Sequence, residues 1–133
     1  MKVEKAVTID RPRAELFRYW RNFENLPRFM DHVKSVSITD NRRSHWAVKG
    51  PAGSTIEWDA AIINEKENEM ISWKSLENAE VENAGSVWFE PSPDGRGTEV
   101  RVVLNYESQQ IEHDLRRFKE IMEADPPAPA ARS

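Results

Sequence analysis

From Val33 to Tyr106 the sequence alternates between apolar and polar residues, with short turn clusters between the alternating runs. A period of two is typical of β-strands that have one buried face and one face in water. It predicts five or six strands, at about 33–40, 43–50, 54–64, 69–77, 81–90 and 97–106. The clusters DNRR, GPAG, NEKEN and PSPDGRG are too short for crossover connections. We therefore expect an antiparallel meander.

One face of this meander is apolar and aromatic. Its members are Ile56, Trp58, Ala60, Ile62, Ile71, Trp73, Val87, Phe89, Val100, Val102 and Leu104. The opposite face carries charged residues such as Glu57, Asp59 and Arg101. Trp88 falls on that polar face, where it is expected to be a surface or interface ring. The sheet therefore needs a cover on its apolar face only.

The segment that follows the meander predicts an amphipathic helix. In QQIEHDLRRFKEIM the apolar residues step by four, three and four, at Ile111, Leu115, Phe118 and Met122. This helix has one place to dock, which is the apolar face of the sheet. A curved sheet around a helix leaves space between the two, because the sheet bends away from the helix axis at its ends.

The segment before the meander begins with a strand, KVEKAVTI, and continues as a helix that we expect Asp10 to cap. The helical stripe consists of Leu16, Phe17, Trp20 and Phe23. Pro27 lacks an N–H, so we expect a break at Asn25–Pro27 and then a short helical turn carrying Phe29 and Met30. This helix–break–helix is expected to close one end of the sheet.

Composition narrows the class of protein. The 133 residues fit one domain, expected at 1–124, followed by a proline- and alanine-rich tail at 125–133 that is expected to be disordered. The net charge of −4, with both signs interspersed, argues against binding to nucleic acid. There is no cysteine, no signal-peptide pattern and no bilayer-length apolar run, so a cytoplasmic protein is expected.

The chain resembles a known family in several ordered blocks, which together cover about residues 3–122. They are ELFRYWRNFENLPRFMDHVKSV, RSHWAVKGPAG, TIEWDAAI, ISWKSLENAEVENAGSVWFEP and GRGTEVRVVLNY. These blocks resemble the polyketide cyclase/dehydrase and coenzyme Q-binding branch of the START-like (helix-grip, Bet v 1-like) superfamily. The resemblance implies an α+β fold, in which a curved antiparallel sheet surrounds a long C-terminal helix and two short helices follow the first strand. The link after Tyr106 is shorter than in relatives, which questions any ligand gate there.

The resemblance implies a cavity between the sheet and the last helix. We expect its wall to include the following residues: Trp20, Phe29, Trp46, Trp58, Trp73, Asn83, Phe89, Tyr106, Leu115 and Phe118. Such rings suit a flat hydrophobic ligand. The same rings can also serve only as core packing, and that alternative stays open. Alternation also turns Ser44, Ser75 and Glu77 inward, where buried polar groups need partners.

The histidines do not predict a metal site, because none has metal-ligand spacing to a second ligand. His45 is expected on the polar face, and His113 lies off the helical stripe. His32, near the expected mouth of the pocket, is the one candidate acid or base. No metal and no cofactor are expected.

Three functions remain open at this point. The leading one is non-catalytic binding or carriage of a small hydrophobic molecule, such as a polyketide-like ring, an isoprenoid quinone or a lipid. The alternative is a cyclase/dehydratase-type enzyme, which requires at least two titratable or hydrogen-bonding residues to converge inside the cavity. The third is an interaction module with a vestigial pocket that uses the face around Trp88. We expect a monomer or weak homodimer, without a membrane span but compatible with transient membrane contact.

Overall fold

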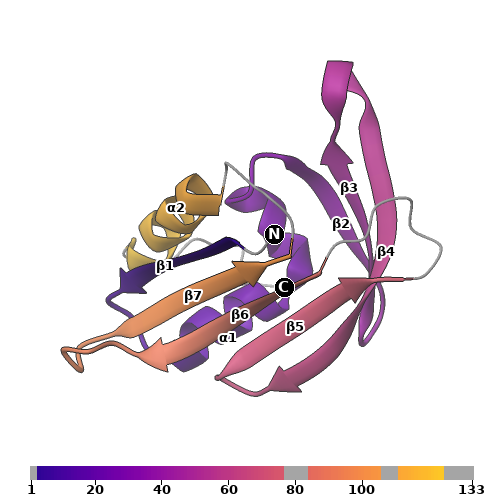
Figure 1. The fold of residues 1–133 in the computed structure, drawn as a ribbon. Helices are drawn as coiled ribbons and strands as arrows, with labels where there is room; N and C mark the ends of the chain where they lie inside the picture. Colours follow the sequence, from indigo (N-terminus) through magenta and orange to yellow (C-terminus); the bar gives the residue numbers. More distant parts are fainter. Residues whose placement is uncertain (1–2, 77–83, 106–110, 125–133) are drawn as a thin grey trace.

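The computed structural model describes residues 3–76, 84–105 and 111–124 and has the predicted α+β architecture (Figure 1). Its elements are β1 (Val3–Ile9), α1 (Arg13–Arg21), η1 (Phe23–Arg28), β2 (Val33–Asp40), β3 (Arg43–Lys49), η2 (Pro51–Gly53), β4 (Thr55–Lys66), β5 (Met70–Ser75), β6 (Ala84–Pro91), β7 (Thr98–Leu104) and α2 (Ile111–Glu123). The expectations for Glu77, Asn83, Tyr106 and the 125–133 tail lie outside the described residues.

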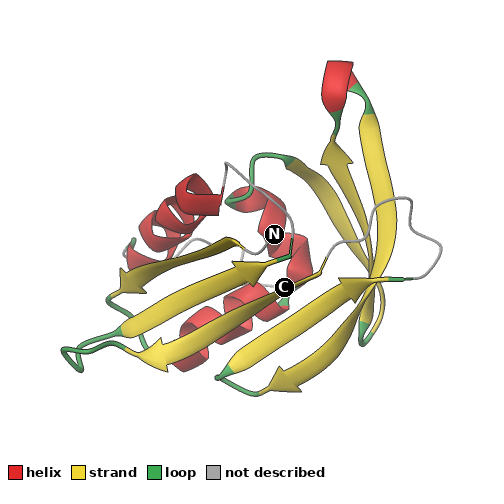
Figure 2. Ribbon diagram, viewed as in Figure 1, coloured by secondary structure: helices red, strands yellow, loops and turns green. Residues whose placement is uncertain are grey.

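In the described part of the chain, the strands form one seven-stranded sheet in the order β1-β7-β6-β5-β4-β3-β2. Every neighbouring pair is antiparallel, which confirms the predicted meander. The first strand joins at the far edge, where Val3 lies opposite Leu104. The sheet curves strongly, and the β3–β4 hairpin, with η2 at its tip, projects away from α1, η1 and α2 (Figures 1 and 2).

The helical elements cover different parts of the sheet: α1 packs on β6, η1 on β2 and α2 on β1. They meet through an aromatic junction of Trp20, Phe29 and Phe118, all buried. The ring centroids of Phe29 and Phe118 are 4.8 Å apart, and Trp20 lies 5.1 Å from each of them. Trp20 also contacts Phe89 of β6, at 6.3 Å. The junction therefore connects both α-helices to the sheet.

Two local predictions about the first helix are wrong. The break lies at Asn22, whose extended backbone ends α1 and whose side chain accepts a hydrogen bond from Glu24 N–H. Pro27 lies inside the 3₁₀ turn η1 instead of at the break. Asp10 does not cap α1, because Pro12 occupies the N-cap position and Asp10 N–H donates to the Glu123 carboxylate.

The outer face of the sheet is polar, as the alternation predicts. His45 bridges Glu57 and Asp59 of β4, at 2.7 and 2.9 Å, and these hydrogen bonds raise the pKa of its imidazole. Trp88 also lies on this face, where the Arg101 guanidinium stands 5.3 Å from its ring centroid. A cation over the indole helps to cover this half-buried ring.

The absence of a side chain at Gly85 is required by close packing against the inner face. A methyl group there would lie 2.7 Å from Cζ2 of Trp73 and 2.9 Å from Cδ2 of Leu104. We expect Gly85→Ala to lower the free energy of unfolding by about 1–3 kcal/mol and to change the near-UV circular dichroism, because the Trp73 indole must move.

Gly95→Asn is the control for this substitution. Gly95 has a positive φ, which asparagine tolerates, and nothing lies within 4 Å of an added Cβ. Urea unfolding should show a smaller loss for Gly95→Asn than for Gly85→Ala. Equal losses, with an unchanged near-UV spectrum for Gly85→Ala, would contradict tight packing at this position.

Candidate functional site

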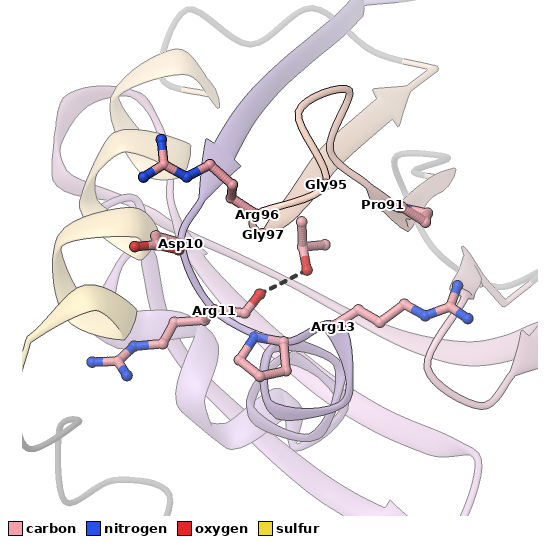
Figure 3. Close-up of a pocket in the computed structure, with 9 residues that line it drawn as sticks. Asp10, Arg11, Arg13, Pro91, Gly95, Arg96 and Gly97 are labelled. Atoms are coloured by element: carbon pink, nitrogen blue, oxygen red, sulfur yellow. Dashed lines mark hydrogen bonds between the residues drawn. The ribbon is translucent and has the colours of Figure 1, made fainter.

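A polar depression of about 390 Å³ lies at the turn between β1 and α1 and the turn between β6 and β7 (Figure 3). Thr98 Oγ1 donates to the backbone oxygen of Arg11 there, and the Arg11 side chain donates to the Met122 carbonyl at 2.8 Å. Arg13 and Arg96 extend in opposite directions (Figure 3). The arginines at this place therefore do not converge on one centre, and Arg11 already holds the end of α2.

A second, largely enclosed cavity lies between the sheet and the first turn of α2. Its lining is Met30, His32, Val33, Trp46, Val48, Trp58, Trp73, Val102, Leu104, Ile111 and Asp114. The space left free is about 20 Å³, which is room for about one water molecule. This is where a ligand between sheet and helix is expected, and it is nearly filled by side chains.

Three tryptophans form one wall of this cavity. The Trp46 and Trp58 rings, on neighbouring strands, stack with centroids 5.7 Å apart and an interplanar angle of 17°. Trp46 also stacks on Trp73, at 6.5 Å. The Trp46 Nε1–H donates to Ser44 Oγ at 2.9 Å, so Ser44, an inward polar residue, serves to hold the indole. The wall therefore presents flat apolar surface, and Trp58 is its half-buried outer member.

Asp114 is the unexpected member of the lining. Its side chain is 1% exposed, and neither carboxylate oxygen accepts a hydrogen bond from a described residue. Burial raises the pKa of this carboxyl to about 7, with smaller opposing effects from the nearby His113 and from the Asp31 backbone, which approaches the carboxylate without hydrogen-bond geometry. The physical cause is desolvation, which disfavours the charged form. Asp114 therefore titrates near neutral pH.

His32 faces Asp114 across the cavity end. Its Nδ1 lies 3.8 Å from Asp114 Oδ2, too far for a hydrogen bond, and this nitrogen is also without a partner among the described residues. Burial lowers the pKa of the imidazole, so the neutral ring is favoured. The backbone is held in place because Lys49 N–H donates to His32 O at 2.8 Å. His113 and Asp31 pair at 3.2 Å beside this site.

The structure brings together only part of the predicted set. Trp46, Trp58 and Trp73 line the cavity, whereas the following predicted residues are buried elsewhere in the core: Trp20, Phe29, Phe89, Leu115 and Phe118. Asn83 and Tyr106 lie outside the described residues. Asp114 was missed, although its position carries a signal: it lies three residues after Ile111 and four before Phe118, on the apolar stripe of α2.

Comparison with known proteins shows the family to which this chain belongs. Residues 9–123 match the family described as polyketide cyclase / dehydrase and lipid transport, and the chain belongs to it. Its fold is the START-like helix-grip fold. No match was found among curated proteins.

Solved structures agree with this assignment. The protein DR_A0006 from Deinococcus radiodurans is 42% identical, with a TM-score of 0.85 over 92% of this chain and 97% of that one. A START superfamily protein from Mycobacterium smegmatis is 14% identical, with a TM-score of 0.73 over 90% and 94%. The di-domain ARO/CYC BexL, from the BE-7585A biosynthetic pathway, is 16% identical, with a TM-score of 0.69 over 92% of this chain and 47% of that one. The last two share the fold.

Two further findings concern the described residues only. They contain no group of three or more His, Cys, Asp or Glu side chains that could hold a metal ion. Within these residues, no helix has the length and apolar character needed to span a membrane.

The buried carboxyl predicts a pH-dependent stability. The folded-state pKa of Asp114 is raised from 3.8 to about 7, so between these values the folded protein binds a proton that the unfolded chain has released. The stability should therefore fall as the pH rises through this window and stay low above it. Asp114→Asn should remove the fall, which we expect to be on the order of 4 kcal/mol, since one pKa unit corresponds to about 1.4 kcal/mol.

Urea unfolding at several pH values measures this difference. Glu112→Gln, an exposed carboxylate on the same helix, is the matched control and should follow the wild-type curve. Parallel curves for wild type and Asp114→Asn from pH 4 to 8 would show that Asp114 does not ionise in a buried setting.

Proposed function

We propose that this protein binds or carries a small hydrophobic molecule in the cavity between its sheet and α2, without catalysing a reaction on it. The observation that carries this proposal is the stack of Trp46, Trp58 and Trp73 along an enclosed apolar cavity. Aromatic side chains offer large contact area and low entropic cost to a flat ligand. The family's description, which names polyketide chemistry and lipid transport, supports the same class of ligand.

A ligand larger than water must displace side chains, because only about 20 Å³ is free. Trp58 is half-buried at the outer end of the stack, and Met30 is an unbranched, adaptable side chain in the lining. We propose that a planar ring enters by moving these two residues and stacks on Trp46. A polyketide-like ring, an isoprenoid quinone and a lipid are the candidate ligands, and a cytoplasmic monomer or weak homodimer is the proposed state.

Replacing a tryptophan of the stack should weaken binding. With N-phenyl-1-naphthylamine as an uncharged fluorescent probe, we expect micromolar binding to the wild type. Trp58→Leu should weaken it by up to about tenfold, because an aromatic contact contributes about 0.5–1.5 kcal/mol. Trp88→Leu, on the outer face, is the matched control and should stay within about twofold of wild type.

Native mass spectrometry of protein purified without detergent, together with a solvent extract of the same sample, tests the natural ligand. A near-stoichiometric hydrophobic compound would name the ligand class. Absence of both probe binding and any co-purifying compound would defeat the proposal. Loss of binding in Trp88→Leu, with none in Trp58→Leu, would move the site to the outer face.

A second candidate function is an enzyme of the cyclase/dehydratase type, favoured by one observation. Asp114 and His32 approach within 3.8 Å at the cavity end, with pKa values shifted toward a protonated acid and a neutral base. In dehydration of a β-hydroxy ketone, His32 would take the proton from the carbon next to the carbonyl. The C=C bond would then form as the C–O bond breaks, and Asp114 would protonate the departing hydroxyl, which leaves as water.

This candidate makes its own prediction. 4-Hydroxy-4-phenyl-2-butanone should be dehydrated to the conjugated enone, whose ultraviolet absorbance rises. The rate should fall about 100-fold in His32→Gln and in Asp114→Asn, the usual scale for losing one acid or base. Ser86→Ala, on the outer face, is the control and should keep the wild-type rate. Dehydration of this compound no faster than in buffer would reject the hypothesis of an enzyme and leave the binding proposal intact.

A further inference from the structure

We propose that Asp114 and His32 make the cavity selective for uncharged cyclic compounds that carry a ketone or phenol oxygen, and make it reject carboxylates. This inference rests on the proposed function, because it concerns the same cavity. It concerns which chemical class of hydrophobic molecule binds and which end of that molecule lies against α2.

The unpartnered polar atoms indicate where a ligand oxygen would bind. Asp114 is almost completely buried, and both of its carboxylate oxygens, like His32 Nδ1, lack a hydrogen-bond partner among the described residues. Buried polar groups without partners are costly and uncommon. A ketone oxygen placed between these two groups would accept a hydrogen bond from the protonated carboxyl. A phenol would both accept and donate there.

The charges around the cavity explain the rejection of acids. Of the described residues that line it, His32 and Asp114 are the titratable ones, and neither supplies a lasting positive charge at neutral pH. The neighbouring groups do not change this. Lys49, at the end of β3, is near enough to help lower the pKa of His32, but its side chain is exposed, and His113 is paired with Asp31 at 3.2 Å. A carboxylate ligand would thus be buried without a cation and next to an acidic side chain.

The rest of the lining fixes the shape of the ligand. The Trp46 indole N–H already donates to Ser44, so it is not free to orient a ligand. Beside the indoles, the lining includes aliphatic side chains such as Val102 and Leu104 of β7 and Ile111 of α2. A ring against the tryptophans, with its one oxygen at the Asp114 end, matches this distribution. A ligand with several polar groups around the ring does not.

Three naphthalene probes separate the contribution of the apolar cavity to binding from those of a ketone oxygen and of a carboxylate. Naphthalene tests the apolar cavity, 2-acetylnaphthalene adds a ketone, and 2-naphthoate adds a carboxylate. Binding is followed by quenching of tryptophan fluorescence at pH 6 and pH 8.5. For the wild type at pH 6 we expect the ketone to bind at least about tenfold more tightly than the carboxylate. The ketone's affinity should fall severalfold at pH 8.5, whereas that of naphthalene should not change.

Two substitutions at Asp114 provide the controls. Asp114→Asn keeps a hydrogen-bond donor without a titrating proton, so it should bind the ketone equally at both pH values. Asp114→Leu should lose the preference for the ketone over naphthalene. Near-UV circular dichroism of each variant verifies that the tryptophan stack is intact.

The outcomes distinguish failure of the proposed binding function from failure of the proposed selectivity. If none of the probes binds, the proposed function and this inference fail together. If naphthalene binds but 2-naphthoate binds as tightly as the ketone, the binding function stands and the selectivity is overturned. The same holds if Asp114→Leu leaves the ketone preference unchanged.

Discussion

The rest of the structure depends on covering one face of a strongly curved sheet with three separate helical elements, α1, η1 and α2. The cover is held by the aromatic junction, where Trp20 of α1, Phe29 after η1 and Phe118 of α2 meet within 5.1 Å of one another. Large aromatic side chains bury much area at a single point. Removing any one of the three rings would leave a void where the helices meet and weaken their packing on the sheet.

Because that junction lies near the middle of α2, the first turn of the helix reaches a different part of the sheet. There the inner face is built by tryptophans on β3, β4 and β5, and the space is closed by the segment that follows η1. The junction and the cavity are thus adjacent but distinct: one is dense packing, and the other keeps a small void. A burial pattern alone does not distinguish them, since the Trp20 and Trp46 side chains are both buried.

The Asp114 carboxyl in this cavity bears on which hydrophobic molecules the site would bind. An apolar pocket alone favours any hydrophobic molecule. The close approach of Asp114 and His32 gives one end of the cavity a hydrogen-bond donor and an acceptor. The carboxyl costs stability wherever it is ionised, so its place on the apolar stripe of α2 is not explained by packing. A residue that destabilises the fold at the place where a ligand would bind is typical of a functional site.

The sequence by itself determined the meander, the polar outer face with Trp88 and His45, and the amphipathic last helix, because strand and helix periods are local properties. It did not place the helix break at Asn22, which depends on a hydrogen bond within the turn, or exclude Asp10 as a cap, since Asp10 N–H pairs with Glu123, 113 positions away. Only the tertiary structure decided which rings pack and which line a cavity. It also brought His32 and Asp114, 82 positions apart, within reach of each other, because sheet curvature and helix docking have no signature in any single segment.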